Sequence, residues 1–347
     1  MTGGGDCPGL NAVVRAAARR CMQRGVRLLG YKNGWEGVLE GGSMTLDRQA
    51  VKGILPLGGT VLGTSRTDPI VVSDGLERLR RTLDSDGVEG LIVVGGDGTL
   101  SAAAELTKEG FKLVGVPKTI DNDLSATDTT FGFDTAVGIA TDAIDRLHTT
   151  AEAHNRVIVI EVMGHHTGWI AAYAGIAGGA DVILVPEHPF DVEMVCERIR
   201  ARQRQGRNFS IVVIAEGARP AEFGGGPPDR RARVKAGAIS TWLANEIERC
   251  IQTETRTVVL GHVQRGGSPT AHDRILATRF GVHAIDVALA GEWGVMVALK
   301  GTAIVTVPLE EAVQQIKELD PAIWEIAQVF MSGIEDQLTG IEYRKAG

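Results

Sequence analysis

The 347-residue chain has only four cysteines, Cys7, Cys21, Cys196 and Cys250, and no two of them form a C-x-x-C pair. Isolated cysteines at such spacings argue against a disulfide framework and against a zinc site. They are typical of a protein that works in a reducing compartment. We therefore expect a cytoplasmic protein without structural disulfides.

Long apolar runs are also missing, since none approaches the ~20 residues that a membrane-spanning helix needs. We expect no signal peptide and no contact with a membrane. Positive charge is scarce, because 36 Lys and Arg stand against 43 Asp and Glu, which gives a net charge of −7. Proteins that bind nucleic acid are typically basic, so the composition argues against that class of partner. A small anionic substrate stays compatible with a local positive field.

Glycine, by contrast, is abundant, with 45 residues. Glycines allow tight turns and close approach of a ligand to the backbone, so they fit either phosphate-binding loops or many short turns. The length suits two domains of roughly 150 residues each.

Strand-like and helix-like segments alternate along most of the chain. Apolar strand-like runs cover residues 26–31, 91–94, 112–116, 157–162, 182–185, 211–215 and 257–260. Helix-like stretches cover residues 11–24, 99–108, 168–177, 192–205, 236–250 and 273–290. Continuous apolar strands between helices predict an α/β fold with parallel sheets that are covered on both faces. Ligands of such folds lie at the carboxyl ends of the strands.

The first glycine turn, T-G-G-G-D-C-P-G at residues 2–9, stands directly before a predicted helix, with no strand ahead of it. Its N–H groups and the helix dipole suit a phosphate, although a purely structural turn explains it equally well. Because such turns normally follow a strand, we expect either that the given chain begins late or that a first strand has been lost. A missing central strand would leave costly unpaired backbone on its neighbours.

Two further turns follow strands and carry carboxylates. In G-G-D-G-T, residues 95–99, Asp97 is a candidate Mg²⁺ ligand or, alternatively, a helix N-cap. In P-K-T-I-D-N-D, residues 117–123, a lysine, a hydroxyl and two carboxylates lie together. A carboxylate near a substrate hydroxyl can accept its proton during phosphoryl transfer, whereas the alternative is an Asx-rich turn.

Five motifs, G-G-D-C-P-G-L-N, G-G-D-G-T, P-K-T-I-D-N-D, E-V-M-G and L-G-H-V-Q-R-G-G-S-P, occur in this order. Together they resemble the 6-phosphofructokinases over about residues 2–320. The resemblance implies two similar Rossmann-like, three-layer α/β domains with the active site in the cleft between them. We expect residues 1–131 with 257–305 to bind the nucleotide, and 132–256 with 306–347 to bind fructose 6-phosphate. It also implies a homo-oligomer, usually a tetramer, whose subunits share active sites.

The resemblance assigns roles to individual residues. Asp121 would be the catalytic base, aided by Thr119, Gly98 and Lys118, and Asp97 would hold Mg²⁺. Residues expected to bind ATP are Gly5, Arg66, Thr67, Gly96, Asp97, Gly98 and Thr99. Residues expected to bind the sugar phosphate are Thr119, Ile120, Asp121, Arg156, Met163, Gly164, His165, Glu216, Arg256, His262, Val263, Gln264 and Arg265. Arg156 and Arg256 would reach the 6-phosphate from a neighbouring subunit.

The chain departs from the family pattern at three positions. Gly98 is typical of ATP users and Lys118 of diphosphate users, so the pair is mixed. We expect ATP to be the donor, because a carboxylate at position 98 would repel the α-phosphate, and the diphosphate-dependent reaction is the alternative. His165 stands where most relatives carry arginine. A weakly active regulatory homologue is a further alternative.

Overall fold

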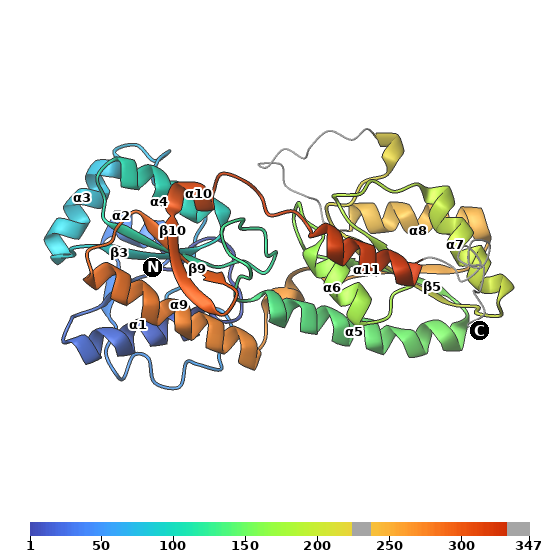
Figure 1. The fold of residues 1–347 in the computed structure, drawn as a ribbon, viewed down its shortest axis with the longest axis horizontal. Helices are drawn as coiled ribbons and strands as arrows, with labels where there is room; N and C mark the ends of the chain where they lie inside the picture. The colour runs from blue at the N-terminus through green and yellow to red at the C-terminus, as the bar shows by residue number, and fades with distance from the viewer. Residues whose placement is uncertain (224–236, 332–347) are drawn as a thin grey trace, which may run out of the picture. The chain divides into compact units, whose positions relative to one another are not determined.

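The computed structural model describes residues 1–223 and 237–331, which form two compact units (Figure 1). Unit 1 contains residues 1–136 and 265–317, and unit 2 contains residues 137–264 with the chain from 318 onward. We expected the chain to pass between the domains at residues 257 and 305, whereas in the structure it does so at residues 265 and 317. The reason is that strand β8 (Thr255–Val259) belongs to the sheet of unit 2, whereas β10 (Ala303–Pro308) pairs within unit 1.

The sheet of unit 1 has the order β10-β9-β4-β3, with β3 at Leu91–Gly95, β4 at Leu113–Pro117 and β9 at Val295–Lys300. Strands β3, β4 and β9 are parallel, and β10 runs antiparallel to β9. Helices α1 (Leu10–Arg24) and α9 (Ala271–Leu289) lie side by side (Figure 1). Smaller elements complete the unit: β1 (Leu29–Tyr31), α2 (Gly34–Glu40), β2 (Ser43–Thr45), α3 (Gly75–Asp86), α4 (Asp97–Lys108) and α10 (Leu309–Ala312).

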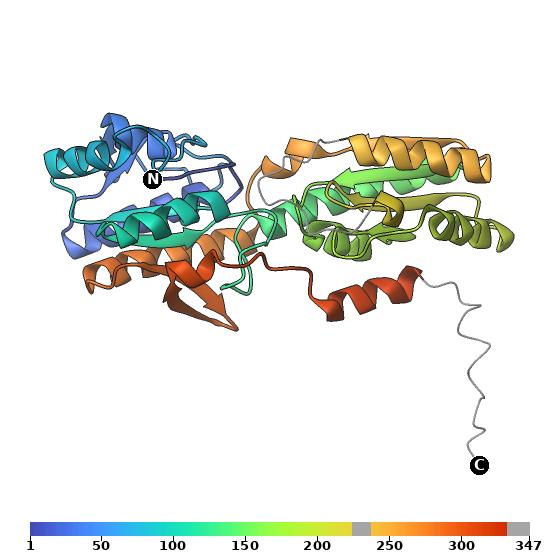
Figure 2. The ribbon, with the colours of Figure 1, turned by 90° about the horizontal axis from the view of Figure 1, so that it is seen from above.

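The sheet of unit 2 is fully parallel, with the order β6-β7-β5-β8 and β5 at Val157–Val162, β6 at Val182–Leu184 and β7 at Ser210–Ala215. Strand β5 is buried along its whole length, as expected for a central strand covered on both faces. Its helices are α5 (Phe133–His154), α6 (Trp169–Ala177), α7 (Val192–Arg204), α8 (Ala238–Ile251) and α11 (Pro321–Met331), with 3₁₀ turns at Ala221–Phe223 and Gly261–Arg265. Helix α11 packs against α6 and β6 (Figure 2).

The α/β fold with mostly parallel sheets is confirmed, and each predicted strand and helix has a counterpart. The sequence did not predict α5, the longest helix at 22 residues. Its buried face is made largely of small side chains, such as Ala136, Ala140 and Ala151, which stand out little in the sequence. The β9–β10 hairpin was also missed, because it interrupts the alternation of strand and helix.

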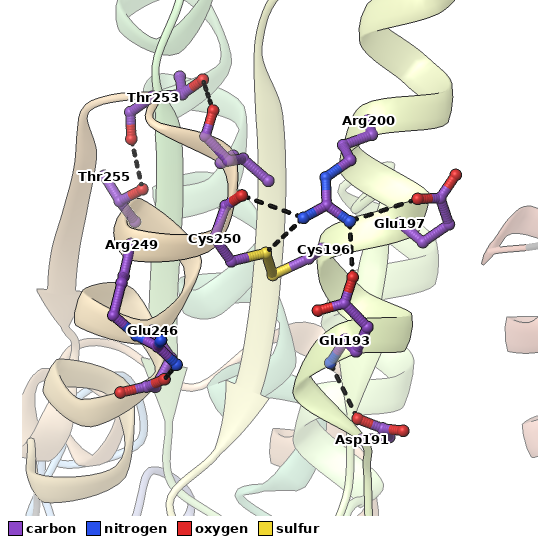
Figure 3. Close-up of a disulfide and its surroundings, with 11 residues drawn as sticks. Asp191, Glu193, Cys196, Glu197, Arg200, Glu246, Arg249, Cys250, Thr253 and Thr255 are labelled. Atoms are coloured by element: carbon purple, nitrogen blue, oxygen red, sulfur yellow. Dashed lines mark hydrogen bonds and ion pairs between the residues drawn. A yellow bond between two sulfur atoms is a disulfide. The ribbon is translucent and has the colours of Figure 1, made fainter.

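One expectation about the cysteines is wrong, because Cys196 of α7 and Cys250 of α8 form a disulfide with their Cα atoms 6.5 Å apart (Figure 3). The two positions are 54 residues apart in sequence, and only the packing of α7 against α8 brings them together. Arg200 donates to the Cys250 carbonyl at 3.0 Å and pairs with Glu193 at 2.7 Å (Figure 3). Cys7 and Cys21 are free and buried.

No helix within the described residues is long and apolar enough to cross a membrane. The glycine- and proline-rich composition of residues 218–235 predicts a solvated loop, and most of that segment lies outside the described residues, as does the polar end at residues 343–347.

Candidate active site

Three turns of unit 1 meet at the carboxyl edge of its sheet. Thr2 bridges to Val94 of β3 in parallel, and the chain then turns at residues 3–6. Strand β3 runs through Gly95 into Gly96, the N-cap of α4, and β4 ends at Pro117 directly before Lys118. Since β3 and β4 are parallel neighbours, their carboxyl ends lie next to each other. The fold therefore gathers the three turns that the sequence singled out.

These turns are in close contact and have little room for side chains. A Cβ atom added to Gly95 would lie 2.4 Å from Thr99 Cβ, and one added to Gly3 would lie 2.8 Å from Thr99 Cγ2. Gly4 has φ of 77°, a left-handed conformation that favours glycine. At Gly98, by contrast, an added Cβ would meet no atom of the described residues within 4 Å. The first turn of α4 thus opens onto free space at this one position.

Asp121 lies beside a hydroxyl group in a largely buried setting, and both Asp121 and Thr119 are only 8% exposed. The Asp121 N–H donates to Thr119 Oγ1 at 3.0 Å, and Thr119 Oγ1 lies 3.4 Å from Asp121 Oδ2. Thr130 Oγ1 donates to the Thr119 carbonyl at 2.8 Å and fixes the turn. A carboxylate held in this way is suited to accept a proton from a substrate hydroxyl.

Negative charge accumulates around Asp123. Burial first, and then the charge of Asp121, raise the pKa of Asp123 from 3.8 to about 7, and Asp97 adds to the effect. Its Oδ1 is buried and has no hydrogen-bond partner among the residues that the structure describes. Such a field favours a cation, so the residues fit Mg²⁺. No cluster of three or more His, Cys, Asp and Glu in the described chain could hold a metal alone.

Lys118 brings a buried cation to the same place. Its side chain is 3% exposed, and its Nζ donates to the Gly5 carbonyl at 2.5 Å. Burial lowers the pKa of Lys118, while the charges of Asp121 and Asp123 act in the opposite direction. The lysine therefore ties the first glycine turn to the turn that carries Asp121.

Arg265 and the segment around Arg66 also adjoin the first turn. Arg265 Nη1 donates to the Asp6 carbonyl at 3.1 Å, and a Cβ added to Gly5 would lie 2.1 Å from the same nitrogen. Thr64 Oγ1 donates to the Gly4 carbonyl at 2.5 Å, and the Gly4 N–H donates to the Ser65 carbonyl at 3.0 Å. Arg66 and Thr67 follow this anchored stretch, and Arg66 is exposed.

In unit 2, a second group lies at the carboxyl ends of β5 and β7. Met163, Gly164 and His165 follow β5, and Glu216 follows β7. The His165 N–H donates to Glu216 Oε1 at 3.0 Å. His165 adopts a φ of 53°, and its ring centroid lies 3.8 Å from that of His166. The structure thus brings the M-G-H turn and Glu216 together.

Arg156 and Arg256 lie at the opposite end of this sheet. Arg156 precedes β5 and binds Glu254 at 2.5 Å, and Arg256 of β8 contacts the same carboxylate. Six strand residues separate Arg156 from Met163, a span of roughly 20 Å at ~3.3 Å per residue. Within a single chain, the two arginines therefore lie too far from the M-G-H turn to act together with it.

Ile120 and Gln264, both expected to bind the sugar phosphate, have buried side chains. Ile120 is fully buried in the core, so only its backbone remains available. Gln264 is also fully buried, and its Nε2 donates to the Gly261 carbonyl at 3.1 Å. Val263, in the same 3₁₀ turn as His262, is 62% exposed.

Sequence reasoning overlooked two acidic residues. Asp123 was visible as the second carboxylate of P-K-T-I-D-N-D but received no role. Glu161 of β5 is 2% exposed, accepts from Gly237 N and Ser240 Oγ at 2.6 Å each, and so anchors the start of α8. A single glutamate in an apolar strand was the available signal.

A glycine-rich strand-turn-helix site, a hydroxyl-flanked carboxylate and a buried lysine are the parts of a phosphotransferase that acts on an alcohol group. The family model for Phosphofructokinase matches residues 1–288, and the chain belongs to that family.

Named relatives and a solved structure agree with this assignment. The chain is 56% identical over 336 residues to a Pyrophosphate--fructose 6-phosphate 1-phosphotransferase of Streptomyces coelicolor, which covers 95% of this chain and 98% of that protein. It is 49% identical over 333 residues to ATP-dependent 6-phosphofructokinase 3 of the same organism, with 94% and 98% covered. A phosphofructokinase structure from Saccharomyces cerevisiae aligns with a TM-score of 0.81 at 33% identity, covering 95% of this chain and 46% of that one.

Proposed function

We propose that this enzyme transfers a phosphoryl group from ATP to the 1-hydroxyl of fructose 6-phosphate, giving fructose 1,6-bisphosphate. The open space at Gly98 is the observation that favours ATP as the donor. A nucleotide needs room beyond its β-phosphate, and no described atom occupies the position where a side chain at residue 98 would begin. The glycine turns at residues 3–6 and 95–99 supply N–H groups for the donor phosphates.

The acceptor side of the reaction depends on Asp121. Its carboxylate takes the proton of the 1-hydroxyl as that oxygen attacks phosphorus, and Thr119 holds the carboxylate in place. Lys118, Arg66 and Arg265 place positive charge beside the turns where negative charge spreads over the transferring group. His165 and Glu216 hold the sugar.

Asp97, at the first position of α4, would hold Mg²⁺ together with donor phosphates and water. The ion would neutralise the charge of the donor phosphates. The raised pKa of Asp123 supports this assignment, since the charges of Asp121 and Asp97 both act on its carboxylate.

Arg156 and Arg256 suit a role in the active site of a second subunit. They share Glu254 at the amino end of the sheet of unit 2, far along β5 from the M-G-H turn. Guanidinium groups bind phosphate oxygens in a bidentate manner, so a neighbouring chain that presents a sugar 6-phosphate here would be well matched. This supports a homo-oligomer with shared sites, for which we propose a tetramer working in the cytoplasm.

Diphosphate is the second candidate donor, and two observations favour it. Lys118, the residue type of diphosphate users, is buried and directed at the first glycine turn. The relative with 56% identity is named for diphosphate, whereas the ATP-dependent relative is 49% identical.

Steady-state assays with ATP and with diphosphate, at fixed fructose 6-phosphate and Mg²⁺, separate the two donors. We expect kcat/KM for ATP to exceed that for diphosphate by more than 10-fold. Gly98→Asp should raise the KM for ATP at least about 10-fold, because like charges some 4 Å apart repel by several kcal/mol near a protein surface.

Gly138→Asp adds the same side chain at another open helical glycine and serves as the matched control. A wild-type preference for diphosphate would overturn the choice of ATP. Turnover near background with both donors would instead favour the weakly active regulatory homologue.

A further inference from the structure

Asp121 lies in a loop, residues 118–131, whose two ends are fastened together. The first and last residues of this loop form a parallel β-bridge, and Thr130 Oγ1 donates to the Thr119 carbonyl at 2.8 Å. A loop closed in this way resembles an Ω-loop, whose shape depends on the side chains packed inside it. The position of Asp121 therefore depends on what holds the middle of the loop.

One side chain from outside this loop contacts both of its halves. Lys317 Nζ donates to the Thr127 carbonyl at 3.2 Å and also to the Asp128 carbonyl. The same nitrogen lies 3.5 Å from Asn122 Oδ1, and the Lys317 N–H donates to the Asp123 carbonyl at 2.9 Å. An ammonium group has three N–H donors, so it can bind these three side-chain and carbonyl oxygens at once. One lysine thus ties the first half of the loop to the second.

Asn122 is the residue through which this lysine can act on Asp121. It follows Asp121 directly, is buried, and adopts a φ of 53°, a left-handed conformation that is uncommon outside glycine. Its Oδ1 accepts from the Thr130 N–H at 3.2 Å and from Lys317 Nζ. Backbone in such a conformation persists only where its surroundings hold it. Loss of the lysine contact therefore releases the backbone that keeps the Asp121 carboxylate beside Thr119.

We propose that Lys317 is a positioning residue for the catalytic base: it holds the loop so that the Asp121 carboxylate stays within reach of the substrate hydroxyl. The lysine acts through Asn122 and the Asp123 carbonyl. This inference rests on the proposed function, in which Asp121 accepts the proton of the 1-hydroxyl. Because residues of unit 2 hold the sugar in that function, removal of the ammonium group lowers kcat and leaves the KM for the sugar phosphate nearly unchanged.

Lys317→Met keeps the length of the side chain and removes its hydrogen bonds. We expect kcat to fall at least about 10-fold while the KM for fructose 6-phosphate changes less than about 3-fold, since small displacements of a catalytic group are costly. Lys300→Met is the matched control, because Lys300 Nζ also contacts this loop, 3.5 Å from Oδ1 of the exposed Asp128 carboxylate. An exposed ion pair contributes little, so the control should keep the kcat of the wild type.

Amide exchange of the peptide that contains residues 118–131 tests the same idea without the reaction. Exchange there should be at least about 10-fold faster in Lys317→Met than in the wild type and unchanged in Lys300→Met, because the first variant loses the tie between the halves of the loop. Unchanged exchange in Lys317→Met, or a kcat within about 2-fold of the wild type, overturns the proposal.

Two further outcomes also overturn it. A higher KM with unchanged kcat would assign Lys317 to sugar binding, and faster exchange spread evenly over unit 1 would reduce its role to general stability. A wild type that turns over with neither ATP nor diphosphate would instead refute the proposed function, while the exchange measurement still decides whether Lys317 holds the loop.

Discussion

Replacing Asp123 with Asn should stabilise the protein, and by an amount that depends on pH. Burial and the charge of Asp121 raise the folded-state pKa of Asp123 from 3.8 to about 7. One pKa unit corresponds to 1.36 kcal/mol, so the ionised carboxylate destabilises the folded state by about 4 kcal/mol at pH 8. Part of the side chain reaches solvent, which screens the charge and makes this an upper value.

The direction of the pH dependence follows from the raised pKa. The folded state holds the proton more tightly than the unfolded state, so the cost is absent below about pH 4 and grows as the pH rises. The destabilisation reaches its full size above about pH 7, the pKa of Asp123 in the folded state. At pH 5 the same relation gives less than half of the cost at pH 8. Asp123→Asn should therefore gain most at pH 8.

Urea unfolding of wild type and variant at pH 5 and pH 8, in EDTA and without donor, measures this difference. Asp145→Asn, an exposed position on α5, is the matched control and should change stability equally at both pH values. A gain for Asp123→Asn that is the same at pH 5 and pH 8, or a loss at pH 8, would show that the charges around this turn are already compensated.

Three further predictions concern the site and the disulfide. Asp121→Ser should lower kcat roughly 10²-fold or more while the KM for fructose 6-phosphate changes little, because the base acts on the proton and not on sugar binding; near-normal turnover would remove Asp121 from this role. His165→Arg should raise kcat, because the longer, forked guanidinium group can bind phosphate oxygens in a bidentate manner and an imidazole cannot; unchanged rates would mean that the position does not limit turnover. Cys196→Ser should lower the free energy of unfolding by about 4 kcal/mol, the chain-entropy value for a loop of this length, and a reductant should lower it for wild type but not for the variant. Unfolding curves of the wild type that do not respond to reductant would contradict the disulfide.

The sequence was a good guide where a motif is local. The turns at residues 95–99 and 117–123 follow strands in the structure as predicted, because apolar runs that end in glycine or proline define both the strand and its end. It was a poor guide where spacing in sequence says nothing of spacing in the fold. The Cys196–Cys250 pair depends on helix packing across 54 residues, and strand β8 joins a sheet that begins almost 100 residues earlier.

Residue roles show the same division. The fold places Lys118, Thr119 and Asp121 together because they share one turn. Ile120, between them, is fully buried in the core, whereas Thr119 and Asp121 keep a small exposed fraction. The Arg265 contact with the first glycine turn was not foreseen, because it joins residues about 260 positions apart.

The contact between Arg265 and the turn at Gly5 joins two groups to which we assign different substrates. Any side chain at position 5 would occupy the place of the guanidinium group, 2.1 Å from an added Cβ. A donor that shifts this turn moves an arginine assigned to the sugar phosphate, and a sugar phosphate that draws the arginine away removes its bond to the Asp6 carbonyl. With the proposed roles, binding of either substrate would therefore affect binding of the other through this one turn, which has no room for a methyl group at position 5.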